Sequence, residues 1–280
     1  MVEDLNLKHF LGKLNVDNRI IKLIKKEVSL PDYIDDLNSV SEYWYPHPPC
    51  LIPLFLGHGA SYKGIVNHFF CDRENTYVEY FLESGFLSEI ARNADQFLTL
   101  IALRMIITKD ELTDEIIEFC KLNNLEEYKA IDEFVVDYGD DPEEFDHLVY
   151  FKGNRPFKYL KTIDGYRGDF PSSLFILNTK KHLENAAFKE IAPIELLDQL
   201  EERAPWLTGK QSGMDLFQNY VNNDQLKEAW LTLDGGGWLL SDVANALEQL
   251  KLKTKDDLFT AVADYWIAGW KNSTFLDGKY

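Results

Sequence analysis

The chain has 280 residues, 45% hydrophobic and 14% aromatic, which is enough to bury a substantial core and excludes wholesale disorder. Its formal net charge of −18 argues against nucleic acid or an anionic membrane as a direct partner, because both require a basic surface. The acidity is compatible with a basic protein partner and equally with simple solubility.

The cysteines, the first residues and the length of the apolar runs together predict the cellular compartment of the protein. Cys50, Cys71 and Cys120 are odd in number and widely spaced, which predicts a reducing environment without a disulfide framework. The first residues lack the basic and apolar regions of a signal peptide, and no apolar run approaches the roughly 18 residues of a membrane span. We therefore expect a soluble cytoplasmic protein.

The chain begins with apolar periodicity typical of helices. Residues 3–27 are predicted to be helical, with lysines toward the C-terminal end that complement the helix dipole. A second helix is predicted to start at Pro31, with Ser29 as its N-cap, and to carry Ile34, Leu37 and Val40 inward.

An aromatic and proline-rich loop follows. Tyr43, Trp44 and Tyr45 precede three prolines within four positions, which exclude both a helix and a regular ladder of hydrogen bonds. The three aromatic side chains could form a contact patch for a partner, or they could fold back to cap the sheet. Both interpretations remain open from the sequence.

Residues 51–106 contain the densest group of β-forming residues in the chain. They predict strands at 51–56, 62–70 and 76–81, followed by a helix from Phe86 to Ile106. The loop between the first two strands contains His58 between two glycines, which suits a tight turn or the close approach of a ligand to the backbone. His58 is therefore a candidate partner-binding residue.

Acidity is concentrated in the next part of the chain. Residues 110–134 are predicted to be helical with a break at Asn123–Asn124, and residues 101–150 hold fifteen Asp and Glu against four Lys and Arg. This acidic run could be solvated or could dock a basic partner; it fails the pattern of a calcium loop. The candidate partner-binding carboxylates are Asp137, Asp140, Asp141, Glu143, Glu144 and Asp146.

The remaining chain divides into a β-like and a helical part. Short strands are predicted at 148–151, 157–160 and 174–177, and helices at 194–200, 214–220, 225–233, 239–250 and 256–270. The predicted class is α+β, a mostly antiparallel sheet flanked by helices and followed by a helical C-terminal region. We divide the chain into residues 1–145, a β-rich connection at 146–180 and residues 181–280.

The sequence matches none of the catalytic or metal-binding motifs that we considered. The six histidines do not show the spacing of a zinc helix, and His68 is expected to have a hydrogen-bonded structural role in a strand. Asp234 and the three glycines after it lack the pattern of a phosphate loop and predict a connection between helices. We predict no catalytic residue, no metal and no cofactor.

The order of several short segments resembles the SUKH superfamily, which includes yeast cell-wall glucan regulators and many bacterial immunity proteins. Its members typically show an early Leu-Pro-x-x-Tyr segment, an Ile-Pro strand, a strand ending in an acidic turn and an Ile-Ala-x-Ser-Phe-x-x-Phe-Leu helix. The corresponding segments here are LPDYI at 30–34, LIPL at 51–54, YVEYF at 77–81 and EIARNADQFL at 89–98, where Asn93-Ala94 stands for the usual Ser-Phe. The resemblance covers residues 1–107.

The resemblance implies an α+β domain and a non-enzymatic role. Bacterial members of the superfamily look like cytoplasmic immunity proteins that bind and block toxins, often nucleases. An acidic inhibitor would be steered electrostatically to the basic surface of such a toxin. The alternatives are a scaffold or regulatory protein of the same fold with a different partner, and an enzyme whose site has no recognised signature.

Overall fold

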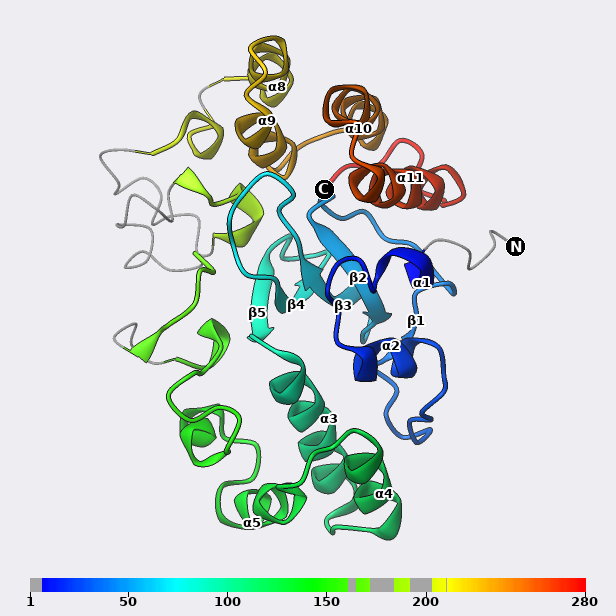
Figure 1. Ribbon diagram of the computed structural model, residues 1–280, viewed down its shortest axis with the longest axis vertical. Helices are drawn as coiled ribbons and strands as arrows, with labels where there is room; N and C mark the ends of the chain where they lie inside the picture. Colours follow the sequence, from blue (N-terminus) through cyan, green and yellow to red (C-terminus); the bar gives the residue numbers. More distant parts are fainter. Residues whose placement is uncertain (1–6, 161–164, 172–183, 192–202, 210) are drawn as a thin grey trace.

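The computed structural model describes residues 7–160, 165–171, 184–191, 203–209 and 211–280. At its centre is an antiparallel sheet of five strands, which lie side by side in chain order (Figure 1). The strands are β1 (Asn38–Ser39), β2 (Leu51–Leu56), β3 (Ser61–Val66), β4 (Thr76–Phe81) and β5 (Leu87–Ala91). The predicted α+β class is confirmed, and the three predicted strands correspond to β2, β3 and β4, although β3 ends at Val66 and the predicted continuation to residue 70 is wrong.

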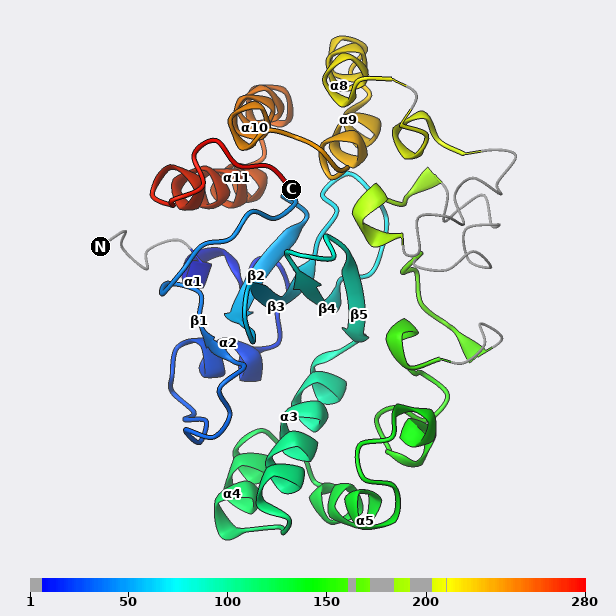
Figure 2. The ribbon, with the colours of Figure 1, turned by 180° about the vertical axis from the view of Figure 1, so that it is seen from behind.

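Helices lie on both sides of the sheet and form the two opposite ends of the molecule (Figures 1 and 2). The helices before residue 140 are α1 (Leu7–Phe10), α2 (Asn18–Ile24), α3 (Ala94–Lys109), α4 (Asp114–Leu122) and α5 (Tyr128–Tyr138). The C-terminal helices are α8 (Gly213–Asn222), α9 (Leu226–Leu233), α10 (Leu240–Thr254) and α11 (Asp257–Lys271). Among the described helices, none combines the length and the apolar character that crossing a membrane requires.

Burial on both faces explains the unbroken apolar sequence of β2. Ile52 and Ile65 lie in a core with α1 to α5, whereas Leu51 and Val78 lie in a second core with α8 to α11. A strand covered on both sides has no solvent-facing positions, so polar residues need not alternate with apolar ones. The C-terminal helices therefore pack directly on the sheet, across the predicted division of the chain into three parts.

The pairing of β2 with β3 depends on a glycine. A Cβ atom at Gly64 would meet the backbone oxygen of Ile52, so only glycine allows the two strands to approach at this point. The register also shifts between Pro53 and Phe55, where proline cannot donate to the ladder.

The predicted helix from Phe86 to Ile106 is wrong in its first part. Leu87–Ala91 form the edge strand β5, which pairs with β4, and the helix starts only at Ala94. The Asn93 side chain caps this helix by accepting a hydrogen bond from the Gln96 backbone N–H at 2.9 Å. Pairing with β4 and the cap at Asn93 together override the helical spacing of the apolar residues.

The N-terminal helices are shorter than predicted. Within 3–27, the described residues form α1 and α2, which are separated by a turn where Asn15 has a φ of 57° and Asp17 caps α2. The predicted helix from Pro31 is also wrong: the segment is irregular and leads into β1, which pairs with β2. Ile34 is nevertheless buried, as the apolar pattern predicted.

The strands predicted at 148–151 and 157–160 are also wrong. These segments form turns and the short 3₁₀ helix η2 (Phe157–Tyr159), after another 3₁₀ helix, η1 (Pro142–His147). The Phe157 backbone N–H donates to the Glu89 carboxylate at 2.8 Å, so a side chain of β5 takes the place of a strand partner. The strand predicted at 174–177 lies outside the described residues.

The other helices agree with the sequence predictions. The break at Asn123–Asn124 separates α4 from α5, and Asn124 has a φ of 53°. The four helices predicted between residues 214 and 270 correspond to α8 to α11. The helix predicted at 194–200 lies outside the described residues.

Candidate functional site

Two groups of polar residues stand out, one on the surface and one in the interior. The first is the acidic lobe, which we define as residues 110–147 and which contains α4, α5 and η1. Of its fifteen carboxylates, thirteen are exposed and two are half-buried, against two lysines. It lies at the end of the molecule opposite α8 to α11 (Figure 2).

The structure brings the six predicted carboxylates together in one part of this lobe. They lie within ten residues, from the last turn of α5 through η1, and all but the half-buried Glu144 are exposed. Glu144 pairs with His147 at 3.3 Å, and Asp146 pairs with Arg155 at 3.1 Å. Asp141 caps η1 by accepting from the Glu143 backbone N–H at 2.9 Å.

Large apolar side chains are exposed among these charges. Leu122 is 54% exposed and Val136 is 78% exposed. On α4, Leu122 shares an outward face with Glu115 and Glu118, since residues three and four apart lie side by side on a helix. On α5, Val136 lies in the same way beside Glu133, three positions before it, and the half-buried Asp132, four positions before it. Solubility alone does not require apolar side chains on the outward faces.

A groove lies beside the acidic lobe. It has a volume of about 600 Å³ and is lined by Asp140 and Phe145 of the lobe and by Phe97 and Ile101 of α3. Its lining also includes Lys63, Arg104 and Lys158, so the groove combines apolar side chains with charges of both signs.

The predicted aromatic residues do not join the acidic lobe. Trp44 packs edge-on against Trp266 of α11, with ring centroids 5.6 Å apart, and Tyr45 donates its backbone N–H to the Tyr62 hydroxyl at 2.7 Å. Tyr43 is 44% exposed and lies against the C-terminal tail, near Phe275. The loop thus folds back on the protein, chiefly onto α11 and the tail.

His58 also lies apart from the acidic lobe. It occupies the turn between β2 and β3, where Gly59 has a φ of 61°, a value that favours glycine. Its Nε2 atom is 3.1 Å from Asp35 Oδ1, and both side chains are more than half exposed. The structure gives His58 an acidic neighbour within the chain.

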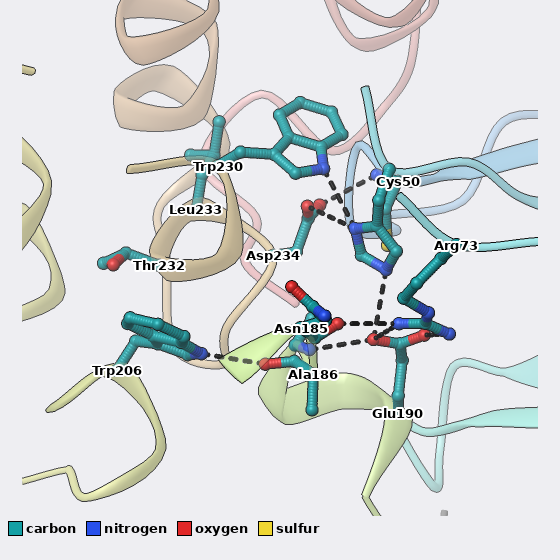
Figure 3. Close-up of polar contacts among 12 residues, drawn as sticks. Cys50, Arg73, Asn185, Ala186, Glu190, Trp206, Trp230, Thr232, Leu233 and Asp234 are labelled. Carbon is teal, nitrogen blue, oxygen red and sulfur yellow. Dashed lines mark hydrogen bonds and ion pairs between the residues drawn. The ribbon is translucent and has the colours of Figure 1, made fainter. Parts of the chain in front are cut away.

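The second group is the buried polar cluster, which lies between the sheet and the C-terminal helices (Figure 3). Its residues come from the segment before β2, the loop after β3, the 3₁₀ helix η4 (Phe188–Glu190), α9 and the C-cap of α9. The side chains are almost completely buried. The cluster consists of Cys50, His68, Arg73, Glu190, Trp230 and Asp234.

An ion pair holds one side of the buried polar cluster. Arg73 Nη1 donates to Glu190 Oε2 at 2.9 Å, and Arg73 Nη2 forms an ion pair with Oε1 at 2.8 Å. The Ala187 backbone N–H also donates to Oε2, at 2.8 Å. Burial would raise the pKa of Glu190, but the charge of Arg73 outweighs it and lowers that pKa below its usual value. Glu190 is therefore ionised.

The neighbours of His68 determine its tautomer. The Trp230 indole N–H donates to Nδ1 of His68 at 3.0 Å, so Nδ1 has no proton. Nε2 consequently carries the proton and donates it to Glu190 Oε2 at 3.1 Å. Burial lowers the pKa of His68 despite the nearby carboxylate, which keeps the ring neutral at neutral pH. The predicted hydrogen-bonded role is confirmed, although His68 follows β3 rather than lying in a strand.

Asp234 completes the buried polar cluster with one oxygen unpaired. Its Oδ1 atom accepts the Cys50 backbone N–H at 2.8 Å, whereas Oδ2 has no hydrogen-bond partner among the described residues and lies 4.0 Å from Nδ1 of His68. Burial raises the pKa of Asp234 well above its usual value. Burial likewise raises the pKa of the Cys50 thiol, which disfavours the reactive thiolate.

Sequence reasoning missed this cluster as a group. Cys50 and Asp234 are 184 positions apart, and Glu190 is 117 positions from Arg73. No local motif connects them; the only signals were the unusual polar His68 among β-formers and the glycines after Asp234. Cys50, His68 and Asp234 are the three residues of the cluster that could hold a metal ion.

No family model, curated protein or solved structure matches the chain.

Proposed function

We propose that this chain is a non-enzymatic protein that binds a basic protein partner through its acidic lobe. The observation that carries the proposal is the exposure of Leu122 and Val136 among carboxylates on the outward faces of α4 and α5. Charged and apolar groups play different parts in such a surface: charges increase the rate of encounter, and apolar side chains supply area to bury.

The partner that fits best within this proposal is a toxin domain of nuclease type, and the chain would then act as a cytoplasmic immunity protein. Two observations support this choice. Residues 1–107 resemble the SUKH superfamily, and the dense exposed carboxylates of the acidic lobe can imitate the phosphates that a nuclease binds through a basic surface. The carboxylates at Asp140, Asp141 and Glu143 are central to this docking surface.

The proposal is tested by affinity capture from an extract of the source organism, with three forms of the full chain. The first is the unaltered chain, and the second reverses four lobe carboxylates to lysine. The third is a control that makes the same change in net charge outside the lobe. The lobe variant alters Asp140, Asp141, Glu143 and Glu144; the control alters Glu42, Asp72, Glu83 and Asp277, which are all exposed.

We expect the unaltered chain and the control to retain the same basic protein at low salt and the lobe variant to lose it. Recovery of a basic nuclease domain that the purified chain inhibits would support the immunity role. Equal capture by all three forms would contradict docking through the acidic lobe, and capture of only an envelope or scaffold protein would contradict the toxin partner.

A further inference from the structure

Three potential metal ligands converge inside the buried polar cluster. The ligand atoms of Cys50, His68 and Asp234 all lie within 4.8 Å of one another. Atoms that share one zinc ion lie about 3 to 4 Å apart, because zinc bonds to sulfur, nitrogen and oxygen measure about 2.0 to 2.3 Å. The three atoms must therefore move closer together by side-chain rotation to share a single ion.

An independent observation points to a ligand at this place. Asp234 Oδ2 is completely buried and accepts no hydrogen bond from a nitrogen or oxygen donor among the described residues, although the Cys50 thiol interacts with the same carboxylate. Buried polar atoms are almost always paired, so an unpaired carboxylate oxygen calls for an explanation. It lies 4.0 Å from His68 Nδ1, and Figure 3 shows Asp234 beside Cys50. A cation bound between these residues would satisfy it.

The surroundings of His68 suit a metal ligand. Metal-bound histidines usually donate their other N–H to a carboxylate or carbonyl, which fixes the ring and its tautomer. Here Nε2 donates to Glu190, which Arg73 and the Ala187 backbone hold in place. The lone pair of Nδ1 is consequently on the side of the ring that faces away from Glu190.

Trp230 competes for that lone pair. Its indole N–H donates to Nδ1 at 3.0 Å, so a metal ion at Nδ1 requires the indole to turn aside. The competition gives the proposal a distinctive consequence: removal of the indole N–H should strengthen metal binding, whereas removal of a ligand should weaken it.

We propose that Cys50, His68 and Asp234 form a site for a zinc ion with a water molecule as the fourth ligand, which joins the start of β2 and the loop after β3 to the end of α9. A thiolate, an imidazole and a carboxylate together favour Zn²⁺ among common divalent cations. In the bound state Cys50 is a thiolate and Asp234 a carboxylate, so their two negative charges balance the charge of the ion, and the proton of the Cys50 thiol leaves to solvent.

The test uses the full chain after treatment with a chelator, and Co²⁺ as a spectroscopic probe that Zn²⁺ displaces. We expect one equivalent of Co²⁺ to give an ultraviolet band from thiolate coordination together with the visible bands of a tetrahedral site. Cys50→Ser should abolish the ultraviolet band, and Asp234→Asn should weaken binding at least tenfold. Cys120→Ser is the matched control, because Cys120 is also buried but lies in α4, and it should retain the band.

Two further variants keep the test decisive. Glu190→Gln should weaken Co²⁺ binding about 10- to 100-fold, because the carboxylate that accepts from His68 Nε2 and orients the ring is lost. Trp230→Phe should strengthen binding. Failure of the unaltered chain to bind Co²⁺ or Zn²⁺ would overturn the proposal, and so would a thiolate band that persists at the same affinity in Cys50→Ser.

Discussion

The acidic lobe and the buried polar cluster use the same chemical groups in opposite environments. In the lobe, thirteen of fifteen carboxylates are exposed, so water and salt screen their mutual repulsion. In the cluster, Glu190 and Asp234 are completely buried. Glu190 stays ionised because Arg73 pairs with it, whereas Asp234 has no Arg or Lys partner among the described residues and burial raises its pKa.

Because of this difference, residues of the acidic lobe can contact a partner, whereas residues of the buried polar cluster stabilise the fold. Exposed carboxylates contribute little to folding, so the lobe can carry many of them at small cost in stability. A buried charge is tolerated only while its partner remains, because the desolvation cost is large. Substitutions in the lobe should therefore alter binding, and substitutions in the cluster should alter stability.

The largest effect is expected for Arg73→Met. The substitution leaves Glu190 buried without its cation, which should lower the free energy of unfolding by about 3–5 kcal/mol in urea titrations. The control is Arg155→Met, which removes the partner of the exposed Asp146 and a hydrogen bond to the Glu143 carbonyl, and it should cost clearly less because Asp146 remains solvated. Equal losses in the two variants would contradict the distinction between the regions.

A second effect should appear on changing the pH, through Glu89. This buried carboxylate accepts from Tyr166 and the Phe157 backbone, and burial raises its pKa from 4.5 to about 7. Because the folded state holds the proton more tightly, the Glu89 contribution to stability is fully present below pH 4.5 and is lost as the pH rises through 7. This loss is about 3 kcal/mol.

Glu89→Gln removes the ionisable group but keeps an oxygen that can accept from Phe157. The stability of this variant should depend less on pH between 4.5 and 7 than that of the unaltered chain, as measured by urea titrations at several pH values. Parallel pH profiles for the two proteins would show that Glu89 has an ordinary pKa. Glu89 thus resembles Asp234: both carboxylates are buried and accept hydrogen bonds, and neither has an Arg or Lys ion-pair partner among the described residues.

A smaller effect is expected at the start of α3, the helix that leads from the sheet to the acidic lobe. Asn93→Ala removes the side-chain acceptor for the Gln96 N–H and should cost about 1 kcal/mol of stability. Asn93→Asp keeps an acceptor and should remain within a few tenths of a kcal/mol of the unaltered chain in urea titrations. A large loss in the Asp variant would mean that packing rather than capping determines this position.

The smallest effect should come from charge reversal in the lobe. The variant with lysine at Asp140, Asp141, Glu143 and Glu144 should differ in stability from the unaltered chain by less than about 1 kcal/mol. Its melting temperature should also rise less with added salt, because fewer like charges repel one another. A large loss of stability would show that these carboxylates hold the fold and would weaken any conclusion from binding experiments with the variant.

The sequence predicted the elements whose signals are local. The strands β2 to β4 follow from their β-forming residues, and the break between α4 and α5 follows from Asn123–Asn124. The strand at Leu87–Ala91 was missed because its apolar spacing also fits a helix, and only pairing with β4 distinguishes the two. Pairing is a property of the folded chain, so a single segment cannot reveal it.

The same distinction applies to the candidate sites. The carboxylates from Asp137 to Asp146 are adjacent in the chain, so the sequence located the acidic lobe, although the exposure of Leu122 and Val136 became visible only in the folded helices. The buried polar cluster joins segments up to 184 residues apart, and neither Arg73 nor Glu190 has a local feature that predicts its partner.

The most direct test of docking through the acidic lobe is the association rate constant of the captured basic partner, measured by stopped flow over a range of salt concentrations. The unaltered chain and the control altered at Glu42, Asp72, Glu83 and Asp277 should associate rapidly at low salt and more slowly as salt rises. The lobe variant should associate at least tenfold more slowly at low salt and depend little on salt. Identical rates and salt dependences for the lobe variant and the control would contradict the account.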